Sequence, residues 1–266
     1  MLVGLGETGA QALRRLKGES GFRFRYSMLN FVELASHLAD PPSEKTHDPF
    51  RKYQTAFRHI HTLFSGVLPS AESILMQGVG LQDHTGKNWI VDGPLIAYQV
   101  KTIAQAESLK DILGAGITPA HYKKLREIDA TSFLGVVNKA RASIKDPLKD
   151  LEAGGKLLGI FYGFLVFRAS SGAIRLESLS KEQQLAVIRF FDLAGGKMFL
   201  SHFLKLLIRM VGDGANEDPN DFYDMLQLLL LRDENIFFVT DDRPFFQYYV
   251  SAEHHRVVPW KGFKSS

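Results

Sequence analysis

Carboxylate side chains occur in three segments of the sequence where they could act together. Asp221 and Asp224 open a predicted helix, and Asp241 and Asp242 directly follow a run of apolar residues. Glu33 interrupts an otherwise apolar helical stretch far upstream. Carboxylate oxygens are the ligands that Mg²⁺ and Mn²⁺ prefer, and such an ion activates water and offsets charge in phosphodiester hydrolysis. The spacing therefore favours a metal-dependent phosphodiesterase centre.

Each of these acids also has an ordinary structural interpretation. Asp221 fits the N-cap of a helix, and Asp224 would complement the helix dipole in the first turn. Asp241 and Asp242 fit a turn, and Glu33 fits a solvated position on a half-exposed helix. Taken singly, Asp221 and one member of the Asp241/Asp242 pair are better explained by structure. The order of the three segments along the chain favours the metal site for the set.

The elements expected to position these acids lie near the two ends of the chain. Residues 21–26 alternate apolar and cationic side chains, which predicts a strand, and Ser27 is a suitable N-cap for a helix over 28–38. A second helix is predicted over 221–231, followed by a buried strand over 236–240. The larger polar side chains of the first helix share one narrow stripe, and these are Asn30, Glu33 and His37.

The long middle of the chain has helical periodicity. We predict helices over 50–64, 94–113, 120–145 and 180–211, the last interrupted at Gly195 and Gly196. Ser180 with Gln183 forms a capping-box pattern at the start of the last helix. A strand and a helix near each end, with helices between them, predict an α/β fold with a parallel sheet.

Composition narrows the classes of protein. The 266 residues contain no cysteine, which excludes disulfides and thiolate zinc sites. The formal net charge of +3 permits nucleic-acid binding without requiring it. The most apolar run, residues 157–167, is much shorter than the roughly 20 residues of a spanning helix. With no secretory signal at the start, we expect a cytoplasmic protein without a membrane anchor.

Weaker motifs suggest other sites. Residues 4–9 match the Gly-x-Gly-x-x-Gly pattern of nucleotide-binding loops, but three residues are too few for the strand that must precede it. His59 and His61, like the adjacent His254 and His255, lack the spacing that puts two ligands on one helix face. Cationic side chains close in sequence to Glu33 could contact phosphates. They are Arg14, Arg15, Lys17, Arg23 and Arg25.

Taken together, the acidic segments resemble the PIN-domain ribonuclease family. The similarity covers about the first forty residues and roughly residues 219–248: the glutamate-bearing helix, the Asp224-Met-Leu-Gln-Leu helix start and the Thr240-Asp241-Asp242 strand end. The resemblance implies a three-layer α/β/α fold formed by 1–43 and 216–266, with 44–215 as a helical insertion. It also implies an endoribonuclease that uses Mg²⁺ or Mn²⁺.

The same resemblance implies roles for single residues. Glu33, Asp224 and Asp242 would be catalytic metal ligands, and Asp221 would assist them. Thr240, Asp241 and Asn30 would support the site. RNA would be the substrate, and both a protein inhibitor and a homodimer are compatible with the family.

One expected acid has no counterpart here. The first strand of the family ends in an aspartate, and the chain instead opens at Met1-Leu2-Val3-Gly4-Leu5, which resembles the residues after that strand. We expect the missing strand and its aspartate to be encoded upstream. The alternative hypothesis is a catalytically degenerate module that binds RNA or a protein partner.

Overall fold

The computed structural model divides the chain into two compact units. Unit 1 comprises Met1–Pro69 and Val91–Ile128, and unit 2 comprises Ser70–Ile90 and Asp129–Ser266. The structure describes residues 6–19, 21–80, 93–152, 155–170, 172–192, 194–212, 224–232, 235–241, 245–246 and 254–260. The helix α7 (Pro119–Ser143) is continuous through the boundary between Ile128 and Asp129.

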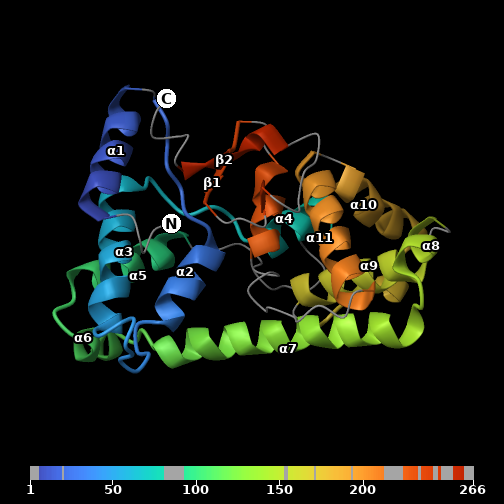
Figure 1. Cartoon of the computed structure of the whole chain (residues 1–266), viewed down its shortest axis with the longest axis horizontal. Coiled ribbons are helices and arrows are strands. Elements are labelled where there is room, and N and C mark those ends of the chain that lie inside the picture. The colour runs from blue at the N-terminus through green and yellow to red at the C-terminus, as the bar shows by residue number, and fades with distance from the viewer. Residues whose placement is uncertain are drawn as a thin grey trace. The chain divides into compact units, whose positions relative to one another are not determined.

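Unit 1 is built from helices joined by short segments (Figure 1). They are α1 (Gly6–Glu19), α2 (Met28–Ser36), α3 (Pro49–Leu63), α5 (Gly93–Gln105), α6 (Leu109–Gly114) and the first part of α7. The predicted cap of α2 is confirmed, because the Ser27 hydroxyl accepts a hydrogen bond from the Asn30 backbone at 3.1 Å. Asp48 caps α3 in the same way, and Pro49 supplies its first turn.

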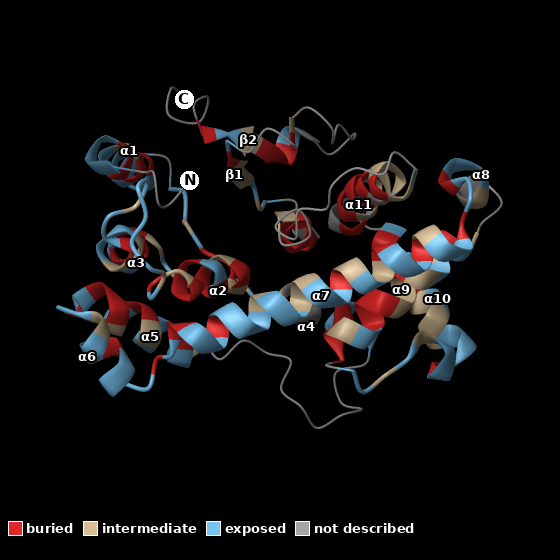
Figure 2. Cartoon of the chain, turned by 60° about the horizontal axis from the view of Figure 1, so that its bottom comes forward, coloured by how far each residue is buried: buried red, intermediate tan, exposed pale blue. Residues whose placement is uncertain are grey.

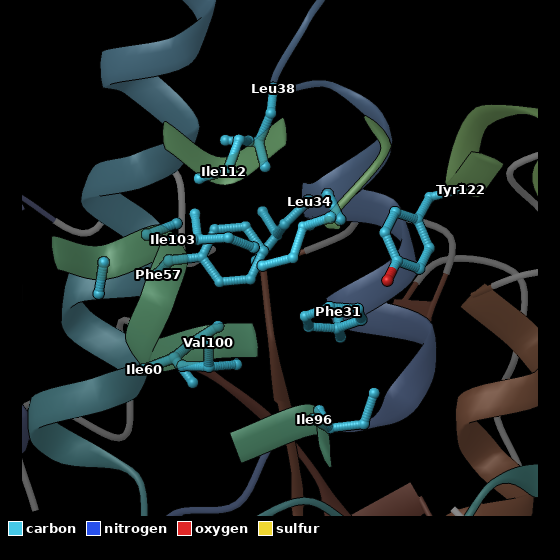
Figure 3. Packing of buried hydrophobic residues seen from close by; sticks show 14 of the residues in the cluster. Phe31, Leu34, Leu38, Phe57, Ile60, Ile96, Val100, Ile103, Ile112 and Tyr122 are labelled. Atoms are coloured by element: carbon cyan, nitrogen blue, oxygen red, sulfur yellow. The ribbon is translucent and has the colours of Figure 1, made fainter. Parts of the chain in front are cut away.

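The core of unit 1 lies where α2, α3 and α5 meet. Figure 3 shows Phe31 and Leu34 of α2 facing Phe57 of α3, with Val100 of α5 beside them. The Phe31 ring forms T-shaped pairs with Phe57 and Tyr122 at centroid distances of 5.7 and 5.3 Å. Edge-to-face contacts of this kind add to the free energy gained by apolar burial.

A carbonyl cap joins α3 to the end of α5. The amide nitrogen of Gln54 donates to the carbonyls of Ile103 (3.0 Å) and Ala106, although Gln54 is fully buried. Further along α3, Arg58 Nε donates to the carbonyl of Ala104 at 3.1 Å, and Arg51 Nη2 donates to that of Glu107 at 2.7 Å. The last carbonyls of a helix lack intrahelical partners, so the side chains of one helix complete the backbone of another. We call Arg51, Gln54 and Arg58, with these carbonyls, the carbonyl cap.

Unit 2 is also predominantly helical in its described part. Its helices are α4 (Ala71–Gly78), the remainder of α7, α8 (Pro147–Glu152), α9 (Lys156–Ala169), α10 (Lys181–Asp192) and α11 (Ala194–Gly212), with the 3₁₀ turns η2 (Leu176–Ser178), η3 (Gln227–Arg232) and η4 (His254–Arg256). The predicted capping box before α10 is confirmed. The Ser180 backbone donates to Gln183 Oε1 at 3.0 Å, and the Gln183 backbone donates to Ser180 Oγ at 3.2 Å.

Aromatic rings fill the core of unit 2. Phe161 of α9 stacks on Phe203 of α11 at a centroid distance of 4.3 Å and on Phe199 at 5.7 Å. Phe191 of α10 lies 5.7 Å from the same Phe161 ring. The most apolar run of the sequence therefore belongs to a core helix. Figure 2 shows buried residues concentrated in α11, whereas exposed residues predominate along α7.

The prediction of a three-layer α/β/α fold around a parallel sheet was wrong. In the described residues the only sheet has two strands, β1 (Phe238–Thr240) and β2 (Val257–Pro259), paired in parallel with Phe238 opposite Val257. The strand expected over 236–240 is present in shortened form. Helices account for most of the described chain, so the molecule is a mainly helical protein with a small parallel pair.

The strand predicted over 21–26 explains part of that error. Its backbone is extended, but Tyr26 forms a single isolated bridge with Val67. The Tyr26 backbone donates to the Gly66 carbonyl at 3.2 Å, and the Ser65 backbone donates to the Phe24 carbonyl at 2.8 Å. Backbone groups of this segment are therefore hydrogen-bonded, within unit 1, to the residues that follow α3. Alternation of side chains predicts an extended backbone but not the partner that pairs with it.

Membrane-spanning helices were not expected, and none of the helices in the described ranges is both long and apolar enough to cross a bilayer.

Candidate functional site

The acids predicted near the end of the chain lie around η3 and β1 in unit 2. Asp224 is partly buried and occupies the helical turn that leads into η3, and residues 225–231 that follow it are buried. Thr240, the last residue of β1, is buried, and Asp241 directly after it is exposed. Asp221 and Asp242 lie outside the described residues.

Glu33 and Asn30, the upstream site residues, both lie on α2 in unit 1. Glu33 is exposed, which fits its structural interpretation as a solvated position on the helix. The side-chain oxygen of Asn30 accepts hydrogen bonds from the Ser27 backbone at 3.2 Å and from the Ser27 hydroxyl at 2.8 Å. Asn30 thus completes the capping box of α2, which is a structural use of the side chain that was expected to line the site.

The described residues do not by themselves form a metal centre. No three histidine, aspartate or glutamate side chains within the described ranges gather closely enough to hold an ion. Of the four predicted ligands, Glu33 belongs to unit 1 and Asp224 to unit 2, and the other two fall outside those ranges. The predicted metal set therefore stays a prediction from the sequence.

A second group of polar side chains, which the sequence did not single out, surrounds the end of α2. His37 Nδ1 lies 2.6 Å from Asp40 Oδ2, and His37 Nε2 lies 2.8 Å from Arg126 Nη1. The same arginine nitrogen donates to the Ser36 hydroxyl at 3.0 Å. Tyr53 of α3 stacks on the imidazole at a centroid distance of 4.9 Å. We call Ser36, His37, Asp40, Tyr53, Lys123 and Arg126 the α2 polar cluster.

The hydrogen bonds of His37 determine its tautomer. A guanidinium only donates, so the Nε2 atom that faces Arg126 must accept. The proton of the neutral ring is then on Nδ1 and is donated to Asp40. Because its accepting nitrogen is already engaged, His37 is not available as a general base in this arrangement.

Charges in the α2 polar cluster act on two pKa values. Burial alone would raise the pKa of the Asp40 carboxyl, but hydrogen bonds from His37 and Lys123 outweigh it and lower that pKa below its ordinary value. Burial raises the pKa of Tyr53, the nearby Asp40 and Glu33 carboxylates raise it further, and Arg126 opposes them. The α2 polar cluster therefore links α2, α3 and α7 through compensated charges.

Of the α2 polar cluster, His37 could be noticed in the sequence as part of the polar stripe of α2. The Lys123–Asp40 and Arg126–His37 contacts join residues 83 and 89 positions apart. Nothing in local spacing predicts pairing over that distance.

A basic extended segment precedes α2 in unit 1. Arg23 and Arg25 are exposed, and the described residues provide neither side chain with an ion-pair partner. Phe24 lies between them and packs against the Phe64 ring at a centroid distance of 6.1 Å. Phe22 is 41% exposed. Free guanidinium groups beside an exposed aromatic ring are the side chains that single-stranded nucleic acids contact.

Comparison of the chain with protein-family models, with curated proteins and with solved structures finds no match in any of the three.

Proposed function

We propose that the chain is a metal-dependent endoribonuclease that hydrolyses RNA phosphodiesters. The observation that carries the proposal is the sequence of elements around β1. A strand paired in parallel ends at buried Thr240 and is followed by exposed Asp241, and partly buried Asp224 lies in the helical segment before it. Acids at the carboxyl end of parallel strands are a common way to present charge to a ligand. The resemblance to PIN-domain ribonucleases supports the same chemistry.

The proposal retains Glu33, Asp224 and Asp242 as the catalytic acids, with Asp221 assisting. A bound Mg²⁺ or Mn²⁺ would supply an activated water and offset charge on the phosphate. Arg23 and Arg25 are proposed to contact RNA phosphates, because their guanidinium groups are exposed and free of carboxylates in the described chain.

Cleavage of a labelled single-stranded RNA by the full chain tests this proposal. We expect cleavage with Mn²⁺ or Mg²⁺ and none with a chelator. The Glu33→Gln, Asp224→Asn and Asp242→Asn variants should each lower the rate about 100-fold or more, because each removes a group assigned to the chemistry. The matched controls Glu44→Gln and Asp192→Asn alter exposed carboxylates elsewhere and should cleave like the wild type.

Two outcomes would contradict the enzyme assignment. Cleavage that survives the chelator, or that is unchanged in all three variants, would place the activity elsewhere. RNA binding without cleavage under any metal condition would favour the degenerate binding module instead. A parallel thermal melt with Mn²⁺ gives a readout independent of activity, since a ligand that binds the folded state raises its melting temperature.

A further inference from the structure

Arg256 is a buried charged side chain for which the proposed function has no use. It ends η4 and directly precedes β2, and it is only 2% exposed. The register of the parallel pair puts Val257 opposite Phe238, so Arg256 lies at the amino end of the pair. Asp241 follows Thr240 at the carboxyl end. Arg256 and Asp241 therefore lie at opposite ends of the two strands.

Within the described residues, the guanidinium of Arg256 has no hydrogen-bond partner. Its Nε, Nη1 and Nη2 atoms are all covered, and none of them donates to any group in the part of the chain that the structure describes. An arginine keeps its charge at any physiological pH, so it cannot avoid the cost of burial by losing a proton. A charge that is buried without a counter-charge destabilises a fold.

The open donors of Arg256 indicate the chemistry of the missing partner. A guanidinium presents five N–H groups in a planar fork that matches oxyanions. Carboxylates and phosphates both pair with one edge of that fork through two oxygens, and a phosphate carries the larger negative charge. We propose that Arg256 anchors a binding site for a phosphate group, either inorganic phosphate or the terminal phosphate of a nucleic acid. Because the nitrogens are covered, the anion reaches them through a local opening of unit 2.

Thermal unfolding of the full chain in phosphate, compared with chloride at equal ionic strength, tests the site. A ligand at about 100 times its Kd should raise the melting temperature of the wild type by roughly 5 to 10 °C. The Arg256→Met variant should melt roughly 2 to 8 °C above the wild type in chloride, because it removes a buried charge that has no counter-charge in the described chain. It should gain nothing from phosphate.

Matched variants separate this site from general charge effects. Arg189→Met removes an exposed charge from α10 in the same unit and should keep the full phosphate response. Arg256→Lys keeps the charge without the fork and should show a reduced response. An equal phosphate response in the wild type and Arg256→Met, or no wild-type response beyond that in chloride, would overturn the proposal. The wild-type comparison stands even if Arg256→Met fails to fold.

Two short oligonucleotides distinguish the sources of the phosphate. One carries a 5′-phosphate, and the other has the same sequence with a 5′-hydroxyl. Stabilisation by the phosphorylated strand alone supports a terminal-phosphate site, and stabilisation by inorganic phosphate alone supports a site for the free anion. Equal stabilisation by both oligonucleotides, retained in Arg256→Met, would overturn the assignment to Arg256. These measurements omit divalent cations and do not depend on RNA cleavage, so they fail or succeed separately from the nuclease proposal.

Discussion

Two buried polar side chains, one in each unit, have opposite surroundings. Gln54 in unit 1 is fully buried, and its amide donates to two backbone carbonyls and accepts from Arg51 Nη1 at 2.9 Å. Arg256 in unit 2 is buried to nearly the same degree, yet its three nitrogens find no acceptor in the described chain. The first side chain is explained by the fold around it, and the second is not.

This difference indicates where in the molecule a ligand should be sought. A polar group whose partners are all present contributes to stability and requires nothing further. A buried group without partners opposes folding, and it persists in natural sequences when something outside the chain compensates it. The α2 polar cluster belongs with Gln54 in this respect, because its charges face opposite charges or hydrogen-bond partners.

The largest expected effect comes from the satisfied side chain. Gln54→Met keeps the length of the side chain and leaves the Ile103 and Ala106 carbonyls without their donor, which should lower the free energy of unfolding by roughly 2 to 5 kcal/mol. Urea denaturation gives this value directly. Gln105→Met, an exposed change at the end of α5, is the control. Gln54→Met should lower the stability of the protein, whereas Arg256→Met should raise it. A Gln54→Met variant that is as stable as its control would contradict this difference.

A smaller loss is expected at the edge of the carbonyl cap. Arg58 is exposed, so the Ala104 carbonyl can be hydrated once the Arg58→Met variant removes the donated hydrogen bond. We expect a loss of about 1 kcal/mol, in line with a single hydrogen bond whose acceptor is rescued by water. Arg23→Met, which removes an exposed arginine without a described partner, should be nearly neutral. If Arg58→Met lost as much stability as Gln54→Met, burial of the acceptor would not determine the size of the loss.

The smallest effect concerns the pH dependence of the α2 polar cluster. The pKa of Asp40 is lowered in the folded state. Its stabilising contribution is therefore present above the pKa of the unfolded state, about 3.9, and is lost as the pH falls through the pKa of the folded state. The stability difference between the wild type and Asp40→Asn should be under about 1 kcal/mol, since the pair is partly exposed, and should shrink in acid.

Acid titration of unfolding measures this dependence for both proteins. Glu44→Gln supplies the control for an exposed carboxylate in the same unit. A difference between the wild type and Asp40→Asn that grows as pH falls would contradict the direction assigned to the Asp40 pKa.

Local structure could largely be predicted from the sequence. Ser27 and the Ser180–Gln183 pair cap helices as their types and spacing predicted, and a helix predicted over 120–145 is observed as α7. The helix predicted over 94–113 is instead divided into α5 and α6, because Ser108 begins a new capped helix. Periodicity and capping act within a few residues, so they survive whatever the tertiary fold imposes.

Features formed between distant segments could not be predicted from the sequence. The carbonyl cap joins positions about fifty residues apart through backbone acceptors, which leave no trace in side-chain patterns. The sheet was overestimated because the extended segment before Ser27 pairs with the loop after α3. Arg256 looked like an ordinary residue of the tail, and only its burial made it informative. The predicted metal ligands were chosen from local patterns, and they stay a prediction.

The use of main-chain acceptors at the end of α5 has a consequence for sequence drift. Arg51, Gln54 and Arg58 recognise groups that every amino acid carries, so this recognition places no demand on the side chains at exposed positions such as Gln105 and Glu107. Descendants of this gene should lose or keep the three donors as a set while those neighbours vary freely. We therefore expect the exposed positions near the end of α5 to tolerate substitution as long as the three donors on α3 are kept.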